Sequence, residues 1–413
     1  MADTEVDPHI ETIGAEFFAD PHSHYRSWRE RGPVCRIRFP DGVVRWLILG
    51  HAAGQAALGD PRLRKDARGT DRLLSITRQV PPSSDPHTLA LITHMLNTDP
   101  PEYTRLCELA SRAFTPGRIA ALRPRIEQIT TELLDALDGR DEVDLMREFA
   151  VPLRSQVNCE LLGVPMSDRD AFQEWSKTLV AVVGSGRERA RTSAAMAGFL
   201  TRLVRDKREH PGEDLLSGLI YPGVSETVAA EDHSLTEREL VAMAFLLLVA
   251  GHETAVDLIG NGMLALLRDR VRLHGLRADR TLVPAAVEEI LRCDGPADMA
   301  TVRYTATPIT VAGTAIPAGE LVYVVLAAAN RAPRRNRAPE DFDTSGHLGF
   351  GHGIHFCLGA PVARLEAQIA LTALLQRFPQ MHLSPSAPPI RWRTSTLIRG
   401  ILEFRVRLDA RTA

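Results

Sequence analysis

The chain has 413 residues, of which 44% are hydrophobic and 24% are charged, and its formal net charge is −3 at pH 7. This composition is ordinary for a soluble globular protein, and the charge provides no basic region for binding nucleic acid. The length alone suggests two or three domains, but no linker, internal repeat or low-complexity segment marks a boundary. We therefore expect one large domain over residues 1–413.

The sequence also carries no recognisable targeting signal. Residues 1–18 are acidic and have neither a basic start nor an apolar stretch, which argues against a conventional signal peptide. No uninterrupted apolar run reaches the roughly 18 residues of a membrane span. The five cysteines are scattered and never form a Cys-x-x-Cys pair, so we expect neither a disulfide framework nor a cysteine-based zinc site. A cytoplasmic protein without a membrane segment is predicted.

Taken in chain order, the first elements are mainly helical. Residues 20–34 predict a helix that a Gly-Pro pair ends, and a second helix begins at the prolines after Asp99, with apolar side chains recurring on one face over 106–114. Residues 68–93 and 210–233 lack periodicity and carry Gly, Pro and Ser, so we predict mobile loops there. Other predicted elements are helices at 118–137 and 168–182 and strands at 34–39, 43–49 and within 308–327. The fold class is therefore mainly α with small β-sheets.

The longest predicted helix follows a capping box made by Thr236 and Glu239. Its apolar residues continue to about residue 267, which corresponds to a helix roughly 45 Å long. A helix that is apolar nearly all round is expected to be buried. The sequence therefore predicts that this helix crosses the core.

The middle of this helix reads AGHETA, which places polar side chains where burial is expected. Burying the carboxylate of Glu253 is costly unless the group is paired or hydrated. Two interpretations remain open: Glu253 and Thr254 are functional, or Thr254 bonds to a backbone carbonyl while Glu253 pairs with a core arginine. We interpret His252 as a packing residue.

A shorter helical segment over 283–292 places Glu289 and Arg292 on one face. Alone this spacing is a weak signal, because most such pairs lie on the surface and contribute only about 0.3–0.5 kcal/mol. The chain then leaves the helix at a Gly-Pro pair and reaches Arg303 in an extended segment.

Near the C-terminal end the chain reads GFGHGIHFCLG, residues 349–359, and a strong helix follows. Cys357 lies at or before the start of that helix, where the dipole favours the thiolate. Glycines around it allow unusual backbone angles and the close approach of a flat group, and Phe350 and Phe356 supply apolar cover. A thiolate under a flat apolar partner is what an axial ligand of haem iron requires. The rival interpretation is a Cys–His nucleophile, but His355 lies two residues from the cysteine and no loop suggests an oxyanion hole.

This stretch resembles the haem-binding loop of the cytochrome P-450 family, F-G-x-G-x-H-x-C-x-G. AGHET resembles the family's oxygen-activating helix motif, and Glu289-x-x-Arg292 resembles its ExxR motif. Similarity extends over nearly the whole chain and is greatest to soluble bacterial members that act on secondary metabolites. The resemblance implies a single triangular, mainly helical domain with a long central helix over the haem.

The resemblance also implies residue roles. Cys357 would be the axial ligand of haem b, and Thr254 and Glu253 would deliver protons during oxygen activation, with the helix breaking its regular bonding at Ala250 and Gly251 to admit oxygen and water. Glu289 and Arg292 would be structural, tying their helix to the segment before the cysteine. The remaining residues expected to bind the haem are His355, Arg303 and Tyr103 at the propionates, and Phe350, Gly351 and Gly359 around the cysteine.

The implied activity is insertion of one oxygen atom from O2, by hydroxylation or epoxidation, into a medium-to-large apolar secondary metabolite such as a macrolide or other polyketide. Electrons would come from a ferredoxin and a ferredoxin reductase using NAD(P)H, and the protein would be a monomer. The alternative is a haem-binding protein of the same fold that does not oxygenate: a carrier, a sensor, or a catalyst of coupling or dehydration. Segments expected to line the substrate pocket are 68–93, the end of 168–182, 297–300 and 394–397.

Two departures from the family pattern bear on how tightly the haem is held. Where the family has a histidine and an arginine that contact the propionates, this chain has Tyr103 and Cys107. The arginine expected soon after Phe342 and Asp343, which would complete a network with the ExxR pair, is also missing. We therefore expect a haem that is bound more loosely than is usual in the family.

Overall fold

The computed structural model describes residues 10–78, 85–180, 186–221, 234–332 and 346–408. The chain forms two compact units. The first unit comprises residues 1–82, 288–357 and 390–402, and the second comprises 83–287, 358–389 and 403–413. Each unit combines segments from distant parts of the chain. The expectation of one domain over residues 1–413 stays a prediction.

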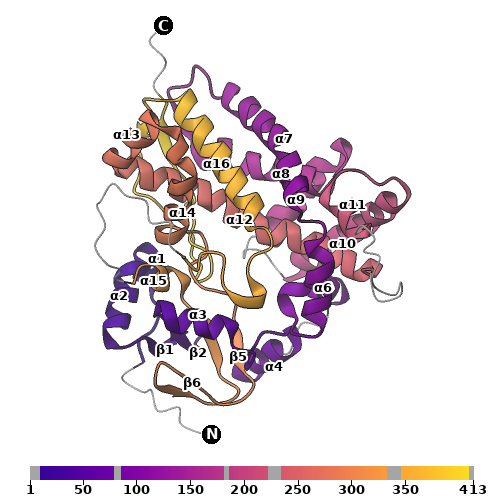
Figure 1. Ribbon diagram of the computed structural model, residues 1–413, viewed down its shortest axis with the longest axis vertical. Coiled ribbons are helices and arrows are strands. Elements are labelled where there is room, and N and C mark those ends of the chain that lie inside the picture. Colours follow the sequence, from indigo (N-terminus) through magenta and orange to yellow (C-terminus); the bar gives the residue numbers. More distant parts are fainter. Residues whose placement is uncertain (1–9, 79–84, 181–185, 222–233, 333–345, 409–413) are drawn as a thin grey trace. The chain divides into compact units, whose positions relative to one another are not determined.

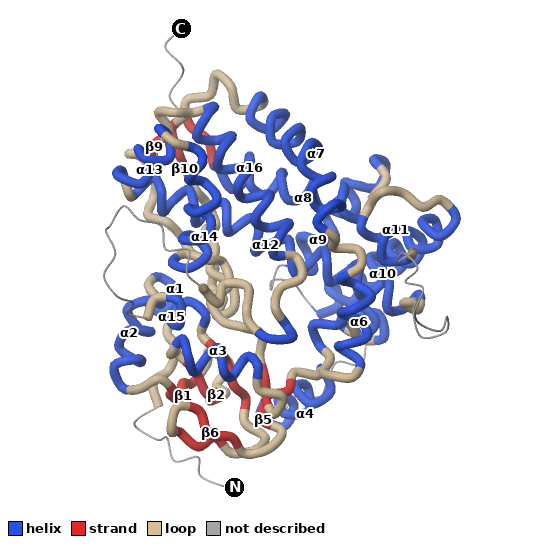
Figure 2. The backbone as a smooth tube through the Cα atoms, in the orientation of Figure 1, coloured by secondary structure: helices blue, strands red, loops and turns tan. Residues whose placement is uncertain are grey.

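The first unit is built on a five-stranded sheet, whose strands lie together in Figure 2. The strand order is β1-β2-β8-β5-β3; β2 and β8 are parallel, and the other neighbours are antiparallel. β6 and β7 form a separate hairpin. The strands are β1 (Val34–Arg38), β2 (Val44–Ile48), β3 (Leu63–Arg64), β5 (Arg303–Thr305), β6 (Ile309–Val311), β7 (Thr314–Ile316) and β8 (Leu321–Val324). The predicted strands in these regions are confirmed.

The helices of the first unit are short. Its most buried large side chains, Phe17, Tyr25 and Trp28, come from the first two helices and pack in one apolar cluster. Asp20 caps the second of these helices by accepting a hydrogen bond from the Ser23 N–H, and the helix ends before Gly32 as predicted. The helices are α1 (Ala15–Ala19), α2 (Pro21–Arg31), α3 (His51–Gly59), α4 (Ala67–Arg78) and α15 (Leu326–Asn330), with a 3-10 turn at Gly353–His355; α14 (Val283–Cys293) belongs partly to each unit.

The second unit is mainly helical (Figure 1). Its helices are α5 (Pro86–Ile92), α6 (Glu102–Ser111), α7 (Pro116–Asp135), α8 (Val151–Leu162), α9 (Arg169–Val180), α10 (Gly186–Glu209), α11 (Leu215–Ile220), α12 (Glu237–Arg268), α13 (Arg270–Ala278) and α16 (Ala360–Arg377). A small sheet has the strand order β4 (Glu142–Asp144), β10 (Arg405–Arg407) and β9 (His382–Leu383).

The long helix α12 begins with the predicted capping box. The Thr236 N–H donates to Glu239 Oε2 at 2.8 Å, and the Glu239 N–H donates to Thr236 Oγ1 at 3.3 Å. α12 packs against α8, α10 and α16. By length and composition it could cross a membrane, but 67% of its most apolar window is buried within the protein, as expected of a core helix.

The prediction of loops at 68–93 and 210–233 is wrong in part. Most of the first stretch forms α4 and α5, and α11 lies in the second. The helices α5 and α11 are short and begin at local caps: Asp85 accepts from the Thr88 N–H at 2.7 Å, and Asp214 accepts from the Ser217 N–H at 2.8 Å. A helix of six or seven residues shows too few turns for apolar periodicity to reveal it. Residues 79–84 and 222–233 lie outside the described residues.

Candidate functional site

The cysteine loop, which we define as residues 349–357, folds back on itself in the first unit. The Cys357 N–H donates to the Phe350 carbonyl at 2.9 Å, and the Gly351 N–H donates to the Leu348 carbonyl at 2.8 Å. The Cys357 side chain is exposed, so its thiol is accessible to a ligand. Phe350 and Phe356 meet edge to face, with ring centroids 6.2 Å apart.

Gly353 is the position in this loop that most clearly requires glycine. Its φ is +73°, and a Cβ atom would lie 3.2 Å from both the Leu58 carbonyl oxygen and the Gly59 Cα at the end of α3. Gly351 also has a positive φ, of +76°, whereas Gly359 has an ordinary φ of −81°. The expectation of unusual backbone angles is therefore confirmed at two of these three glycines.

Two basic side chains, Lys65 and Arg303, lie near His355 of the cysteine loop. β3 pairs with β5 in the antiparallel register Leu63↔Thr305 and Arg64↔Tyr304, so Lys65 follows the end of β3 at the place where Arg303 begins β5. Lys65 and Arg303 are each 4% exposed. Burial, with Lys65 and Arg303 nearby, lowers the pKa of His355 to about 3. Sequence reasoning missed Lys65, because its neighbours depend on a strand pairing that nothing local specifies.

The ExxR pair is buried rather than superficial. Arg292 donates to both carboxylate oxygens of Glu289, at 2.8 and 2.9 Å, and Glu289 is 4% exposed. Arg292 also donates to the Asn330 carbonyl at 2.9 Å, while Asn330 Oδ1 accepts from the Leu348 N–H at 2.7 Å. These bonds connect α14, through α15, to the residue before the cysteine loop. Phe342 and Asp343, after which the family has its third arginine, lie outside the described residues.

In the second unit, α12 is a continuous α-helix through Ala250 and Gly251. The expected break in its regular bonding is therefore wrong for this structure. The Ala250 carbonyl stays within the helix, and Thr254 Oγ1 donates to it at 2.8 Å, which was one of the two interpretations left open. His252 is buried, with Nδ1 3.3 Å from the Asn158 side-chain nitrogen.

A buried ion pair lies against this part of α12. Arg154 Nη1 donates to Glu366 Oε2 at 2.7 Å, and the two side chains are 5% and 0% exposed. A Cβ atom at Gly251 would collide with the Arg154 guanidinium, so glycine makes room for the arginine there. Arg154 thus bonds to Glu366, and the interpretation in which Glu253 pairs with a core arginine stays a prediction.

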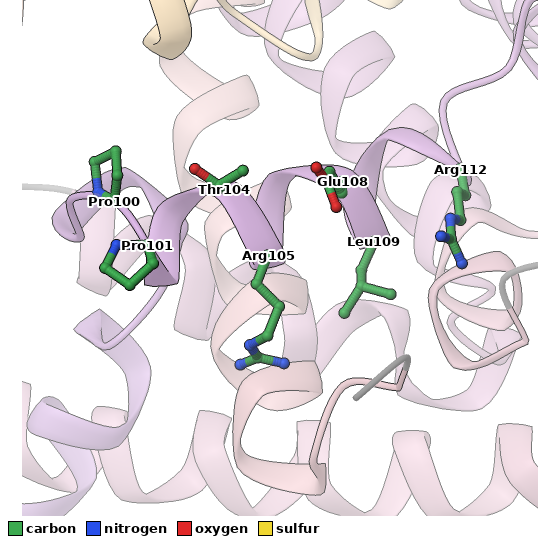
Figure 3. Close-up of a pocket in the computed structure, with 7 residues that line it drawn as sticks. All are labelled: Pro100, Pro101, Thr104, Arg105, Glu108, Leu109 and Arg112. Atoms are coloured by element: carbon green, nitrogen blue, oxygen red, sulfur yellow. The ribbon is translucent and has the colours of Figure 1, made fainter. Parts of the chain in front are cut away.

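A pocket beside α6 is lined by charged side chains and by apolar ones (Figure 3). Arg105, one of the lining residues, donates to Glu102 at 2.7 Å and also to Glu239. None of the segments predicted to line the substrate pocket contributes to this pocket. The lining residues are Pro100, Pro101, Thr104, Arg105, Glu108, Leu109 and Arg112.

Comparison with known proteins identifies the family. The family model for cytochrome P-450 matches residues 273–406. The curated protein cytochrome P-450 107B1 of Saccharopolyspora erythraea is 47% identical over 98% of this chain and 98% of its own length, and the 6-deoxyerythronolide B hydroxylase of the same organism is 40% identical over 95% and 97%. The solved structure of the tirandamycin C-bound P-450 monooxygenase TamI superposes with a TM-score of 0.84 at 44% identity, covering 97% of this chain and 100% of that one. The chain belongs to the cytochrome P-450 family.

Membership in the cytochrome P-450 family confirms several predictions. The fold is mainly α with small β-sheets, and the protein is an oxidoreductase of the monooxygenase type that uses haem iron. The exposed Cys357 thiol on a glycine-shaped loop fits an iron ligand, and the buried basic groups of Lys65 and Arg303 beside His355 fit the carboxylates of a haem.

The departure from the family pattern on α6 also has a structural basis. Tyr103 is 3% exposed and lies in the apolar cluster of the second unit. Burial raises the pKa of Tyr103, and the hydrogen bond between its hydroxyl and the Cys107 thiol raises that pKa further. The two side chains therefore share one helix face, as expected from their spacing, and they contact each other. Binding of a propionate by Tyr103 stays a prediction.

Proposed function

We propose that this cytochrome P-450 inserts one oxygen atom from O2 into a medium-to-large apolar secondary metabolite, such as a macrolide or other polyketide, by hydroxylation or epoxidation. The similarity to the 6-deoxyerythronolide B hydroxylase and to TamI, solved with tirandamycin C, supports this substrate class. The single observation that carries the haem-dependent activity is the exposed Cys357 thiol on a loop shaped by two positive-φ glycines.

The proposed cofactor is haem b, which activates O2 when its iron is held by a thiolate. In this proposal Cys357 provides the thiolate, Arg303 and His355 bind the propionates, and Gly351 and Phe350 shape the loop. Gly353 supports this arrangement, because its close approach to the end of α3 fixes the loop beside the Leu58 carbonyl, to which Arg303 donates at 2.9 Å. One network of contacts within the first unit thus positions both the thiol and a basic group.

In the proposed mechanism Thr254 and Glu253 move protons. The Thr254 hydroxyl hydrogen is directed at the Ala250 carbonyl, so its oxygen can accept a hydrogen bond but cannot donate one in that rotamer. Thr254 must turn its hydroxyl away from Ala250 to pass a proton onward. Glu253, which is only partly buried, can then exchange that proton with solvent.

We propose that electrons reach the protein from a ferredoxin and its reductase, with NAD(P)H as the donor. The chain itself has no flavin-binding or dinucleotide-binding fingerprint, so the reducing equivalents must come from a separate carrier. The protein is further proposed to act as a cytoplasmic monomer with one domain.

Turnover with surrogate ferredoxin and reductase tests the proposal. Polyketides, steroids, terpenes and peptides are first screened for shifts of the haem spectrum, and those that bind are incubated with NAD(P)H, O2 and the redox proteins. The expected result is an oxygenated product that depends on both substrate and ferredoxin. NAD(P)H consumption without product for every binding compound would support the non-oxygenating alternative instead.

A further inference from the structure

The first amide of the cysteine loop is held by a histidine. The Gly349 N–H donates to His347 Nδ1 at 3.0 Å, and the other ring nitrogen, Nε2, lies 3.1 Å from Glu288 Oε2 on α14. The His347 side chain is 5% exposed, so the ring is enclosed by the protein. The loop lies directly on the helix, since a Cβ atom on Gly349 would be 2.9 Å from the Leu291 carbonyl oxygen. All these residues belong to the first unit, and His347 links α14 to the start of the loop that carries Cys357.

The hydrogen bonds of His347 determine which ring nitrogen carries the proton. A backbone N–H can only donate, so Nδ1 must accept from Gly349 and carries no hydrogen. The ring hydrogen is therefore on Nε2, where it donates to the Glu288 carboxylate. An anionic acceptor at Nε2 also makes Nδ1 a stronger acceptor, so the two bonds of the ring support each other.

The helix α14 reaches two consecutive amides of the chain by two separate routes. Glu288 and Arg292 are four residues apart on α14 and share a helix face. Arg292 donates to the Asn330 carbonyl, and Asn330 Oδ1 accepts from the Leu348 N–H at 2.7 Å. Glu288 acts on the next amide through His347. The ExxR helix thus fixes the entry to the cysteine loop with one residue outside the ExxR pair.

We propose that His347, with its ring hydrogen on Nε2, is a positioning residue for Cys357. It fixes Gly349 against α14, and the next residue, Phe350, accepts the Cys357 N–H at 2.9 Å, so the restraint is passed along the backbone to the thiol. This inference rests on the proposed function, in which Cys357 binds the haem iron.

The test measures how fast the reduced, carbon monoxide-bound protein loses the red-shifted Soret band of a thiolate ligand at a fixed, sub-denaturing urea concentration. His347→Leu removes both bonds of the ring, and because an amide left without its acceptor is costly, this rate should rise by roughly tenfold or more. His24→Leu is the matched control, since His24 Nδ1 lies 3.4 Å from Glu11 Oε1 in the same unit. The control should leave the rate unchanged.

Two polar variants separate positioning of the thiol from a general loss of stability. His347→Asn should stay close to the wild-type rate, because an asparagine oxygen can accept from the amide two residues on, as Nδ1 does. His347→Gln keeps a donor that can reach Glu288 but has no acceptor at the position of Nδ1, so its rate should approach that of His347→Leu. This difference should persist even if the two haem-free proteins unfold at the same urea concentration.

Two results would overturn the inference: a wild-type rate in His347→Leu, or equal rates in His347→Asn and His347→Gln. The second comparison decides the matter even if His347→Leu fails to fold. A wild type that never shows the thiolate band would instead overturn the proposed function, so the two failures are distinguishable.

Discussion

The two units differ in which buried charged side chains lie close together. In the second unit, Arg154 is paired with Glu366 inside the protein. In the first unit, Lys65 and Arg303 lie near His355 and bond to neutral oxygen atoms. A buried pair of opposite charges is satisfied by the chain itself, whereas the basic groups around His355 fit the carboxylates of the proposed haem. We therefore expect substitutions in the first unit to affect haem binding and those at the ion pair to affect folding.

The largest effect is expected at Cys357, the proposed iron ligand, which lies in the first unit. The reduced, carbon monoxide-bound protein should show the red-shifted Soret band typical of a thiolate ligand, and Cys357→Ser should lose it completely. Retention of the band in Cys357→Ser would contradict the assignment.

The matched controls are serine variants of three other cysteines. Burial raises the pKa of the Cys35 thiol to about 12 and those of Cys159 and Cys293 to about 11. These thiols remain protonated near neutral pH, so their serine variants should keep the band.

The comparison between the units is tested directly by Arg154→Ala and Arg303→Ala. Arg154→Ala leaves the Glu366 carboxylate buried without its cation, and we expect the free energy of unfolding to fall by about 3–5 kcal/mol. Arg303→Ala removes a proposed partner of the haem propionates, so the holoprotein should lose haem markedly. Urea denaturation measures the first effect, and haem transfer to apomyoglobin measures the second.

A double variant provides the control. Replacing Arg154 by Met and Glu366 by Leu removes both charges and should recover most of the stability lost in Arg154→Ala. A double variant no more stable than Arg154→Ala would show that the lost stability does not come from the unpaired Glu366 carboxylate.

Asp298 is a buried acid in the first unit, and its ionisation should make the stability of the protein depend on pH. Asp298 is 2% exposed and accepts a hydrogen bond from the neutral Tyr25 hydroxyl at 2.8 Å. Burial raises the pKa of Asp298 from 3.8 to about 6, although the Tyr25 bond and the charges of Arg399 and Arg331 lower it. The folded protein therefore binds more protons than the unfolded chain between these two values.

The contribution of Asp298 to stability is consequently full below about pH 4 and is lost as the pH rises through about 6. The Asp298→Asn protein has no such titrating group and does not lose this stabilisation. The free energy of unfolding of Asp298→Asn, measured relative to that of wild type, should therefore increase by up to about 3 kcal/mol between pH 4 and pH 7. Denaturation of both proteins across this range measures the difference. A constant difference between the two proteins would show that Asp298 does not titrate there.

On the second unit, Thr254→Ala tests whether α12 contributes chemistry as well as packing. Haem and substrate binding should be retained, but the fraction of NAD(P)H converted to product should fall several-fold and hydrogen peroxide should rise, because proton delivery is lost. Thr201→Ala on α10 is the matched control, since Thr201 also bonds to a backbone carbonyl four residues earlier, at 2.8 Å. Coupling that is unchanged in Thr254→Ala would remove this residue from the mechanism.

The structural features that could be predicted from the sequence are those that depend on neighbouring residues in the chain. The capping box of α12, the end of α2 before Gly32 and the positive φ angles in the cysteine loop each depend on residues adjacent in the chain, and the structure confirms them. The family motifs identified the fold class and the activity in the same way. Short helices such as α5 escaped because seven residues give too little periodicity.

The charge arrangement could not be predicted, because it depends on contacts between distant segments. Arg154 and Glu366 are 212 residues apart, and Lys65 meets Arg303 only through the pairing of β3 with β5. No local pattern around Lys65 distinguishes a buried side chain from an exposed one.

The smallest effect is expected at position 107 on α6, where the family has an arginine. Cys107→Arg restores that arginine, and Arg105 is engaged elsewhere because it donates to Glu102 and Glu239. Cys107→Arg should slow haem transfer to apomyoglobin only modestly, by roughly two- to fivefold, the range of a partly exposed ion pair. A haem-loss rate that Cys107→Arg leaves unchanged or raises would exclude position 107 from haem binding.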